Sequence, residues 1–61
     1  MAAWLAVNKD GSEYIYNDKP YRRNGRWNCF FGDYCIELPK GSVKRIIGME
    51  LTWLDEPVEI E

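Results

Sequence analysis

Short apolar runs alternate with polar turn signals along the whole chain. The turn signals are rich in Asn, Asp, Gly and Pro, and they lie at residues 8–11, 17–20, 24–25, 39–41 and 55–57. The runs between them contain mostly aromatic and β-branched residues, which favour strands. This spacing predicts a mainly β fold, either a small antiparallel meander or an SH3-like barrel of five or six short strands, with one short helical turn before a late strand.

The same pattern predicts where each element lies. Asn24-Gly25 is the strongest signal, because both central residues of a type I′ hairpin turn need a positive φ. Ser42 is expected to cap the helical turn, which Gly48 ends. The expected strands are Trp4–Val7, Glu13–Tyr16, the hairpin Tyr21–Arg23 with Arg26–Cys29, Tyr34–Leu38, Glu50–Leu54 and a last short one at Val58–Ile60, and the helical turn covers Val43–Ile47.

The length of 61 residues corresponds to a single domain, residues 1–61. A chain of this size buries only about 60% of the surface that its unfolded form exposes, so its core is thin. Three Trp, four Tyr and two Phe supply bulk, and most of these rings must be structural. The expected core residues are Trp4, Ala6, Ile15, Cys35, Ile36, Leu38, Ile46, Ile47, Leu51 and Trp53.

The apolar run before Asn8 follows no cationic region and is too short for a signal peptide or a membrane span. Two cysteines are too few for a disulfide scaffold. These two features predict a cytoplasmic protein with reduced thiols and no membrane contact.

The residue that acid–base catalysis most often uses is missing. There is no His, the usual general acid or base near neutral pH, and Cys29 and Cys35 have no imidazole partner. We therefore expect no enzymatic activity, no cofactor and no metal site. The two cysteines are interpreted as small hydrophobic residues, and the alternative is a disulfide under oxidation if the chain turns at Gly32-Asp33.

The segment Pro39–Ser42 ahead of the helical turn has two interpretations. Backbone N–H groups at a helix N-terminus, with a lysine nearby, suit a phosphate. However, the segment has one glycine and lacks the spacing of a phosphate-binding loop. A strand-to-helix turn with a Ser cap accounts for the same residues and is preferred.

Charged residues are segregated along the chain, although the net charge is only −2. The predicted hairpin combines arginines with aromatic rings, as do small barrels that bind single-stranded nucleic acid. Arginine also binds the carboxylates of an acidic protein surface. A third interpretation is an edge hairpin kept soluble by its charges, with Trp27 in the core. The candidate binding residues are Tyr21, Arg22, Arg23, Arg26 and Trp27.

The C-terminal segment is acidic and has its own alternatives. It can imitate a phosphate backbone, oppose the arginine hairpin within the molecule or across a dimer, or simply form a solvated surface. After Arg45 the charged residues are all acids, namely Glu50, Asp55, Glu56, Glu59 and Glu61.

Three segments of the chain belong together in one respect, and they are Trp4–Glu13, Ile36–Gly48 and Leu51–Glu59, roughly half of the chain. They resemble short uncharacterised proteins of gut bacteria and their phages and prophages. The resemblance implies a phage or mobile-element context, and it implies no catalytic or binding residue.

Together these observations predict a non-enzymatic accessory protein, phage- or prophage-related, that acts by protein–protein contact through the hairpin. The alternative is a weak single-stranded nucleic-acid binder that uses the same hairpin. Exposed strand edges and polarised charge also favour a homodimer.

Overall fold

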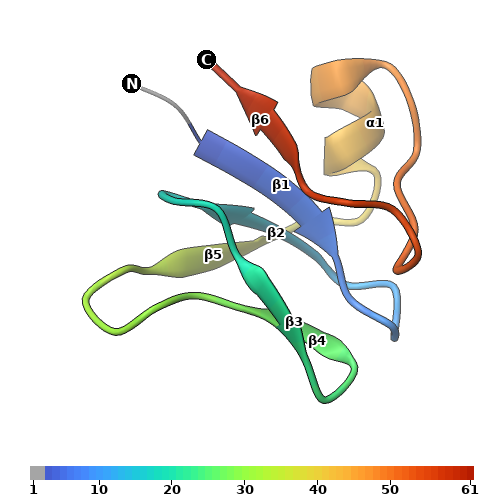
Figure 1. Cartoon of the computed structure of the whole chain (residues 1–61). Coiled ribbons are helices and arrows are strands. Elements are labelled where there is room, and N and C mark those ends of the chain that lie inside the picture. The colour runs from blue at the N-terminus through green and yellow to red at the C-terminus, as the bar shows by residue number, and fades with distance from the viewer. Residues whose placement is uncertain (1–2) are drawn as a thin grey trace.

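The computed structural model describes residues 3–61, which form six strands and one helix. Four strands form an antiparallel sheet in the order β5-β2-β1-β6, and β3 pairs with β4 in a separate two-stranded sheet (Figure 1). The elements are β1 (Ala3–Val7), β2 (Glu13–Tyr16), β3 (Tyr21–Arg23), β4 (Arg26–Asn28), β5 (Cys35–Leu38), α1 (Ser42–Ile47) and β6 (Val58–Ile60).

The mainly β prediction is confirmed, including the short helix before a late strand. The sheets do not close into a barrel, because β5 and β6 remain the outer strands of the larger sheet over residues 3–61. The predicted strand at Glu50–Leu54 is wrong. The Asp55 carboxylate accepts the Thr52 N–H at 2.8 Å, and the Asp55 N–H donates to the Thr52 carbonyl at 3.0 Å. These bonds fold the segment into a turn.

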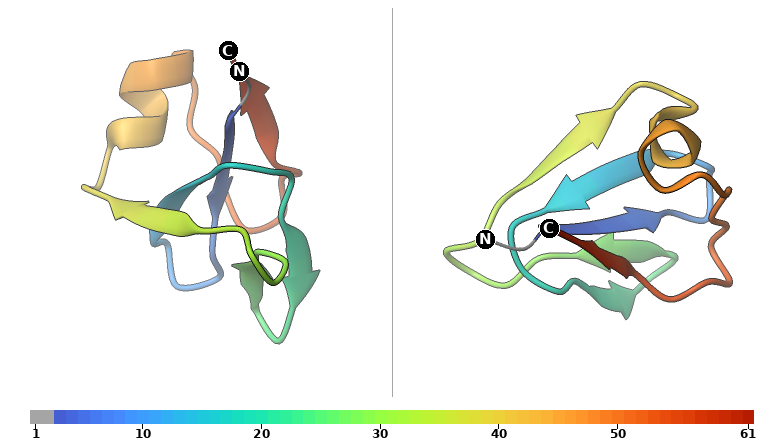
Figure 2. Two further views of the ribbon diagram at one scale, coloured as in Figure 1. Left: turned by 90° about the vertical axis from the view of Figure 1, so that its left-hand side faces the viewer. Right: turned by 90° about the horizontal axis from the view of Figure 1, so that it is seen from above.

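The larger sheet forms the middle layer, with α1 on one face and the β3–β4 hairpin on the other (Figure 2). Successive side chains of a strand point to opposite faces, so the strands of this sheet pack against both neighbours. On one face, Leu5 and Val7 pack against Val43 of α1. On the other face, Ala6 and Tyr16 pack against Trp27 of β4. Consecutive residues of β1 therefore anchor two separate buried clusters.

The predicted core is wrong at three positions. Cys35, Ile36 and Ile46 are exposed, because β5 is an edge strand and Ile46 lies off the helix face that Val43 directs to the sheet. Ala6 is buried as predicted. The other predicted core residues are partly buried against the two clusters, and they are Trp4, Ile15, Leu38, Ile47, Leu51 and Trp53.

A side chain distant in sequence caps the N-terminus of α1. The carboxylate of Glu13 on β2 accepts the Gly41 N–H through Oε2 and the Val43 N–H through Oε1, both at 2.8 Å. The predicted cap by Ser42 is wrong: Ser42 is the first helical residue, and its hydroxyl donates to the Pro39 carbonyl. A negative carboxylate at this helix end also complements the helix dipole.

Removing the Glu13 carboxylate should therefore weaken the attachment of α1 to the sheet. We expect Glu13→Ala to lower the free energy of unfolding by about 1–2 kcal/mol, because two backbone donors lose their acceptor. Glu37→Ala, an exposed acid on the neighbouring strand, is the matched control and should change it by less than about 0.5 kcal/mol. Equal effects of the two substitutions in urea titrations would contradict the assignment of Glu13 as the cap.

Tyr16 is the most buried titratable side chain of the second cluster, with 1% of its surface exposed. Its hydroxyl donates to the Trp27 carbonyl at 3.1 Å. Burial raises the pKa of the Tyr16 phenol well above its ordinary value, and the neighbouring Cys35 and Tyr14 add to the effect.

This raised pKa predicts a loss of stability in alkali. Above about pH 10 the unfolded chain releases the Tyr16 proton while the folded chain retains it, so the free energy of unfolding falls as the pH rises. Tyr16→Phe should be less stable at neutral pH, since it leaves the Trp27 carbonyl unpaired, but its stability should fall less between about pH 9 and 11. An identical pH dependence in both proteins would refute the prediction.

Candidate functional site

The β3–β4 hairpin has an inward and an outward face. The strand register pairs Tyr21 with Asn28, Arg22 with Trp27 and Arg23 with Arg26. Trp27 is buried at 6% exposure, so the central pair faces the larger sheet and the two flanking pairs face outward. The sequence prediction grouped five residues of this hairpin as one binding surface, and the structure divides them between the two faces.

Arg22 contacts other parts of the same molecule, although 39% of its side chain remains exposed. Its guanidinium lies 4.5 Å from the centre of the Trp27 ring and 4.8 Å from that of Trp53. It donates to the carbonyl of Trp53 at 2.9 Å and to that of Asp55 at 3.4 Å, and it lies 3.7 Å from the Glu56 carboxylate. Arg22 therefore holds the segment after α1 against the hairpin, which favours the intramolecular role predicted for the acidic segment.

Trp27 is likewise structural, as the third interpretation of the hairpin expected. Its ring packs edge-on against Trp53, with centroids 5.8 Å apart. Its backbone N–H donates to the Asn8 side-chain oxygen at 2.6 Å, and its carbonyl accepts from Tyr16. The indole N–H is buried and has no hydrogen-bond partner within residues 3–61. Trp27 is thus inaccessible to a base or a peptide.

The outward face retains the free cations. Arg23 and Arg26 lie opposite each other at the tip, are exposed, and form no ion pair with residues 3–61. The Lys9 N–H donates to the Gly25 carbonyl at 3.3 Å, which brings a third exposed cation to the tip. At the other end of this face, the Tyr21 ring contacts Phe30, with centroids 4.7 Å apart.

The loop between β4 and β5 displays aromatic rings that the sequence prediction did not single out. Phe30 is 56% exposed, Tyr34 is 65% exposed, and Phe31 is fully exposed. Asn17 holds the C-terminal end of the loop, since it accepts the Tyr34 N–H at 3.1 Å and donates to the Asp33 carboxylate at 3.3 Å. The adjacent pair Phe30 and Phe31 was the sequence signal for an exposed ring, because neighbouring residues of a strand point to opposite faces and cannot both lie on one buried face.

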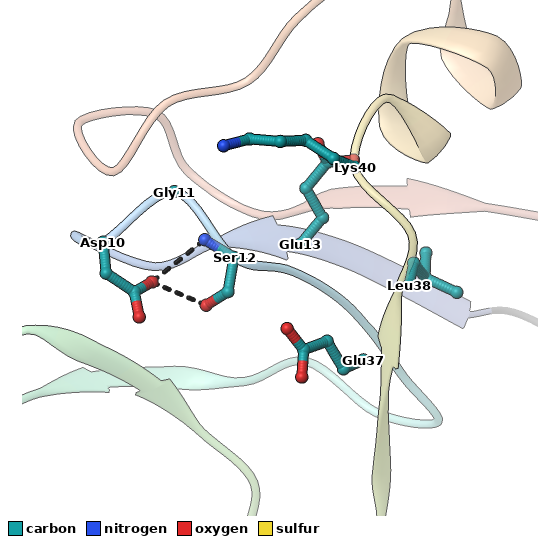
Figure 3. A pocket seen from close by; sticks show the side chains of 7 residues that line it. All are labelled: Asp10, Gly11, Ser12, Glu13, Glu37, Leu38 and Lys40. Carbon is teal, nitrogen blue, oxygen red and sulfur yellow. Dashed lines mark hydrogen bonds between the residues drawn. The ribbon is translucent and has the colours of Figure 1, made fainter.

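A pocket of about 220 Å³ lies beside the β1–β2 turn, and two of its acids, Asp10 and Glu13, are already engaged (Figure 3). Asp10 accepts the Ser12 hydroxyl at 2.6 Å and the Ser12 N–H at 2.9 Å, and these bonds lower the pKa of its carboxyl. Glu13 points to the start of α1, where it occupies the position predicted for a phosphate at Pro39–Ser42. The hypothesis of a phosphate at Pro39–Ser42 is therefore wrong for the Gly41 and Val43 N–H groups, because both already donate to Glu13.

Cys29 and Cys35 are free thiols. Cys29 is half-buried in the cluster around Tyr16, and its thiol donates to the Asp33 carbonyl at 3.8 Å. Cys35 is exposed, but partial desolvation still raises the pKa of its thiol, and the adjacent Cys29 raises it further. A raised pKa keeps the thiol protonated and a poor nucleophile at neutral pH.

The part of the chain that the structure describes has neither a cluster of metal ligands nor a membrane-spanning helix. Within residues 3–61, no three His, Cys, Asp or Glu side chains gather as metal ligands would. The described helix is too short and too polar to cross a membrane. Comparison of the chain with protein-family models, with curated proteins and with solved structures found no match.

The structural contacts of Arg22 predict that its substitution lowers the free energy of unfolding much more than substitution of its neighbour Arg23. Arg22→Ala should lower the free energy of unfolding by about 1–2 kcal/mol, because it removes two ring contacts and two charged hydrogen bonds. Arg23→Ala, the same change one residue away on the outward face, should cost less than about 0.5 kcal/mol. Tryptophan fluorescence in a urea titration measures both values, and equal costs would show that Arg22 is not a structural contact.

Proposed function

We propose that this protein is a non-enzymatic accessory protein that binds a protein partner through one surface. We name this the hairpin–loop surface, and it consists of Tyr21, Arg23, Arg26, Phe30 and Phe31. The contact between Tyr21 and Phe30 carries the proposal, because it joins the free arginines of the hairpin to the exposed rings of the loop. The proposal keeps the cytoplasmic location and the phage or prophage context expected from the sequence.

The composition of this surface favours a protein partner. Aromatic residues and arginine are enriched at protein interfaces and supply most of their binding hot spots. An acidic partner surface with an apolar patch fits both halves, since guanidinium groups bind carboxylates while Phe31 is free to enter a pocket. The held end of the loop also lowers the entropy lost on binding.

Single-stranded nucleic acid is the second candidate, and the observation that favours it is the contact of the Tyr21 and Phe30 rings, tilted by 43°, beside two arginines. The internal engagement of Arg22 weakens it, because few cations remain to contact phosphates. The net charge of −2 also opposes long-range attraction of a polyanion.

Capture experiments with matched charge variants test this proposal. A tagged chain is incubated with lysate of its source cells, with and without nuclease, and retained proteins are identified by mass spectrometry. We expect a discrete protein that survives nuclease, is lost with Arg23→Glu/Arg26→Glu, and is retained with Lys44→Glu/Arg45→Glu on α1. The control pair makes the same change of charge on exposed residues of another element.

Binding to a fluorescent oligothymidine separates the second candidate. If nucleic acid is the ligand, the oligonucleotide binds, its affinity falls log-linearly with salt, and nuclease abolishes all capture. Retention of the protein partner by the Arg23→Glu/Arg26→Glu variant would overturn the role of the hairpin–loop surface.

A further inference from the structure

Within residues 3–61 no strand pairs with the outer edge of β5, and this edge lies on a different side of the molecule from the β3–β4 tip (Figure 2). Its first three residues, Cys35, Ile36 and Glu37, are exposed. Ile36 leaves 57% of its surface in solvent. An open edge presents unpaired backbone N–H and C=O groups, which can pair with another strand.

The hydrogen bonds to β2 determine which groups of β5 point outward. The Asn17 N–H donates to the Tyr34 carbonyl at 3.4 Å, so residue 34 directs its backbone groups toward β2. Residues of an antiparallel strand alternate between facing one neighbour and facing the other. Ile36 therefore faces β2 as well, and the backbone groups of Cys35 and Glu37 point to the open edge.

We propose that two copies of this chain form a symmetric dimer through β5, centred on Ile36. A two-fold axis through an antiparallel pair places one residue opposite its own copy, and opposing side chains share a face. Centring on Ile36 places Cys35 opposite the partner's Glu37 and Glu37 opposite the partner's Cys35. These are the residues with outward backbone groups, and each pair exchanges both of its N–H···O bonds.

Charge and burial favour this register over one centred on Glu37. Centring on Glu37 would place two carboxylates face to face, which is destabilising. Centring on Ile36 instead brings this exposed apolar side chain against its own copy. It also places Lys40, just after β5, next to the partner's Asp33, just before β5. The other open edge, β6, carries Glu59 at its centre and Glu61 beyond it, so it repels its own copy.

Such a dimer would join two four-stranded sheets into one, with both copies of α1 on the same face. It would leave the β3–β4 tip of each copy free, so a dimer would present the exposed Arg23 and Arg26 side chains twice. Two linked surfaces bind a multivalent partner more tightly than one.

Site-directed cross-linking tests the register. In a Cys29→Ser/Cys35→Ser background, Ile36→Cys places a thiol opposite its own copy, within the Cα separation that a disulfide needs. Glu37→Cys is the control, because its copy lies two positions away along the partner strand. Under oxidised glutathione we expect a disulfide-linked dimer for Ile36→Cys and a several-fold smaller yield for Glu37→Cys. The reverse ranking, or equal yields, would overturn the register.

Sedimentation equilibrium tests the dimer without cross-links. The unmodified chain should reach twice its monomer mass as concentration rises. Ile36→Lys should remain monomeric, and Leu54→Lys, the same change at a residue 84% exposed outside the edge, should dimerise like the unmodified chain. A monomer mass at all soluble concentrations, or dimerisation of Ile36→Lys, would refute the proposal. Both readouts are independent of the hairpin–loop surface, so they do not decide the proposed function.

Discussion

The two hydrogen bonds to the Trp27 backbone hold the two sheets of this protein together. The side chain of Asn8 accepts its N–H at 2.6 Å, and the hydroxyl of Tyr16 donates to its carbonyl at 3.1 Å. Both backbone groups point away from β3, because Trp27 and Arg22 form the pair of the hairpin that exchanges no bonds. Asn8 is itself buried, with 3% of its surface exposed. Without these partners, the inward edge of the hairpin would bury unpaired polar groups.

The rest of the second cluster depends on this attachment. Once Trp27 is fixed, its ring supports Arg22 and Trp53, and Arg22 in turn holds the segment between α1 and β6. On the other face of the larger sheet, the Glu13 carboxylate holds α1 by accepting two N–H groups at its N-terminus. The two features that most resembled ligand sites, an arginine between rings and a helix N-terminus, are thus filled by the protein itself. This leaves the outward face of the hairpin and the aromatic loop as free surface.

Local chemistry made much of this fold predictable. Asn24-Gly25 forms the expected hairpin turn with positive φ at both residues, and Gly48 ends α1 in the left-handed conformation. The turn at Thr52 was missed because the Asp55 side chain competes for a backbone donor that a strand needs. The cap of α1 was missed because Glu13 lies about thirty residues from the N–H groups that it binds.

The candidate site was predictable only in part, because its geometry also depends on contacts between residues distant in sequence. Sequence position alone groups Arg22 with Arg23, and only strand alternation together with the buried Trp27 shows that they face opposite ways. Phe31 is exposed because it lies in a turn of the loop between β4 and β5, which the Asp33 N–H closes by donating to the Phe30 carbonyl at 2.9 Å.

Amide hydrogen exchange at Trp27 tests the central role of its backbone most directly. If the hydrogen bond from the Trp27 N–H to the Asn8 side chain attaches the hairpin to the larger sheet, this N–H should exchange only on global unfolding. Its protection should then equal that of the Leu5 N–H in β1. Asn8→Ala should reduce the protection of Trp27 relative to Leu5. Fast exchange of the Trp27 N–H in the unmodified chain, comparable with that of an exposed tip residue, would contradict the account.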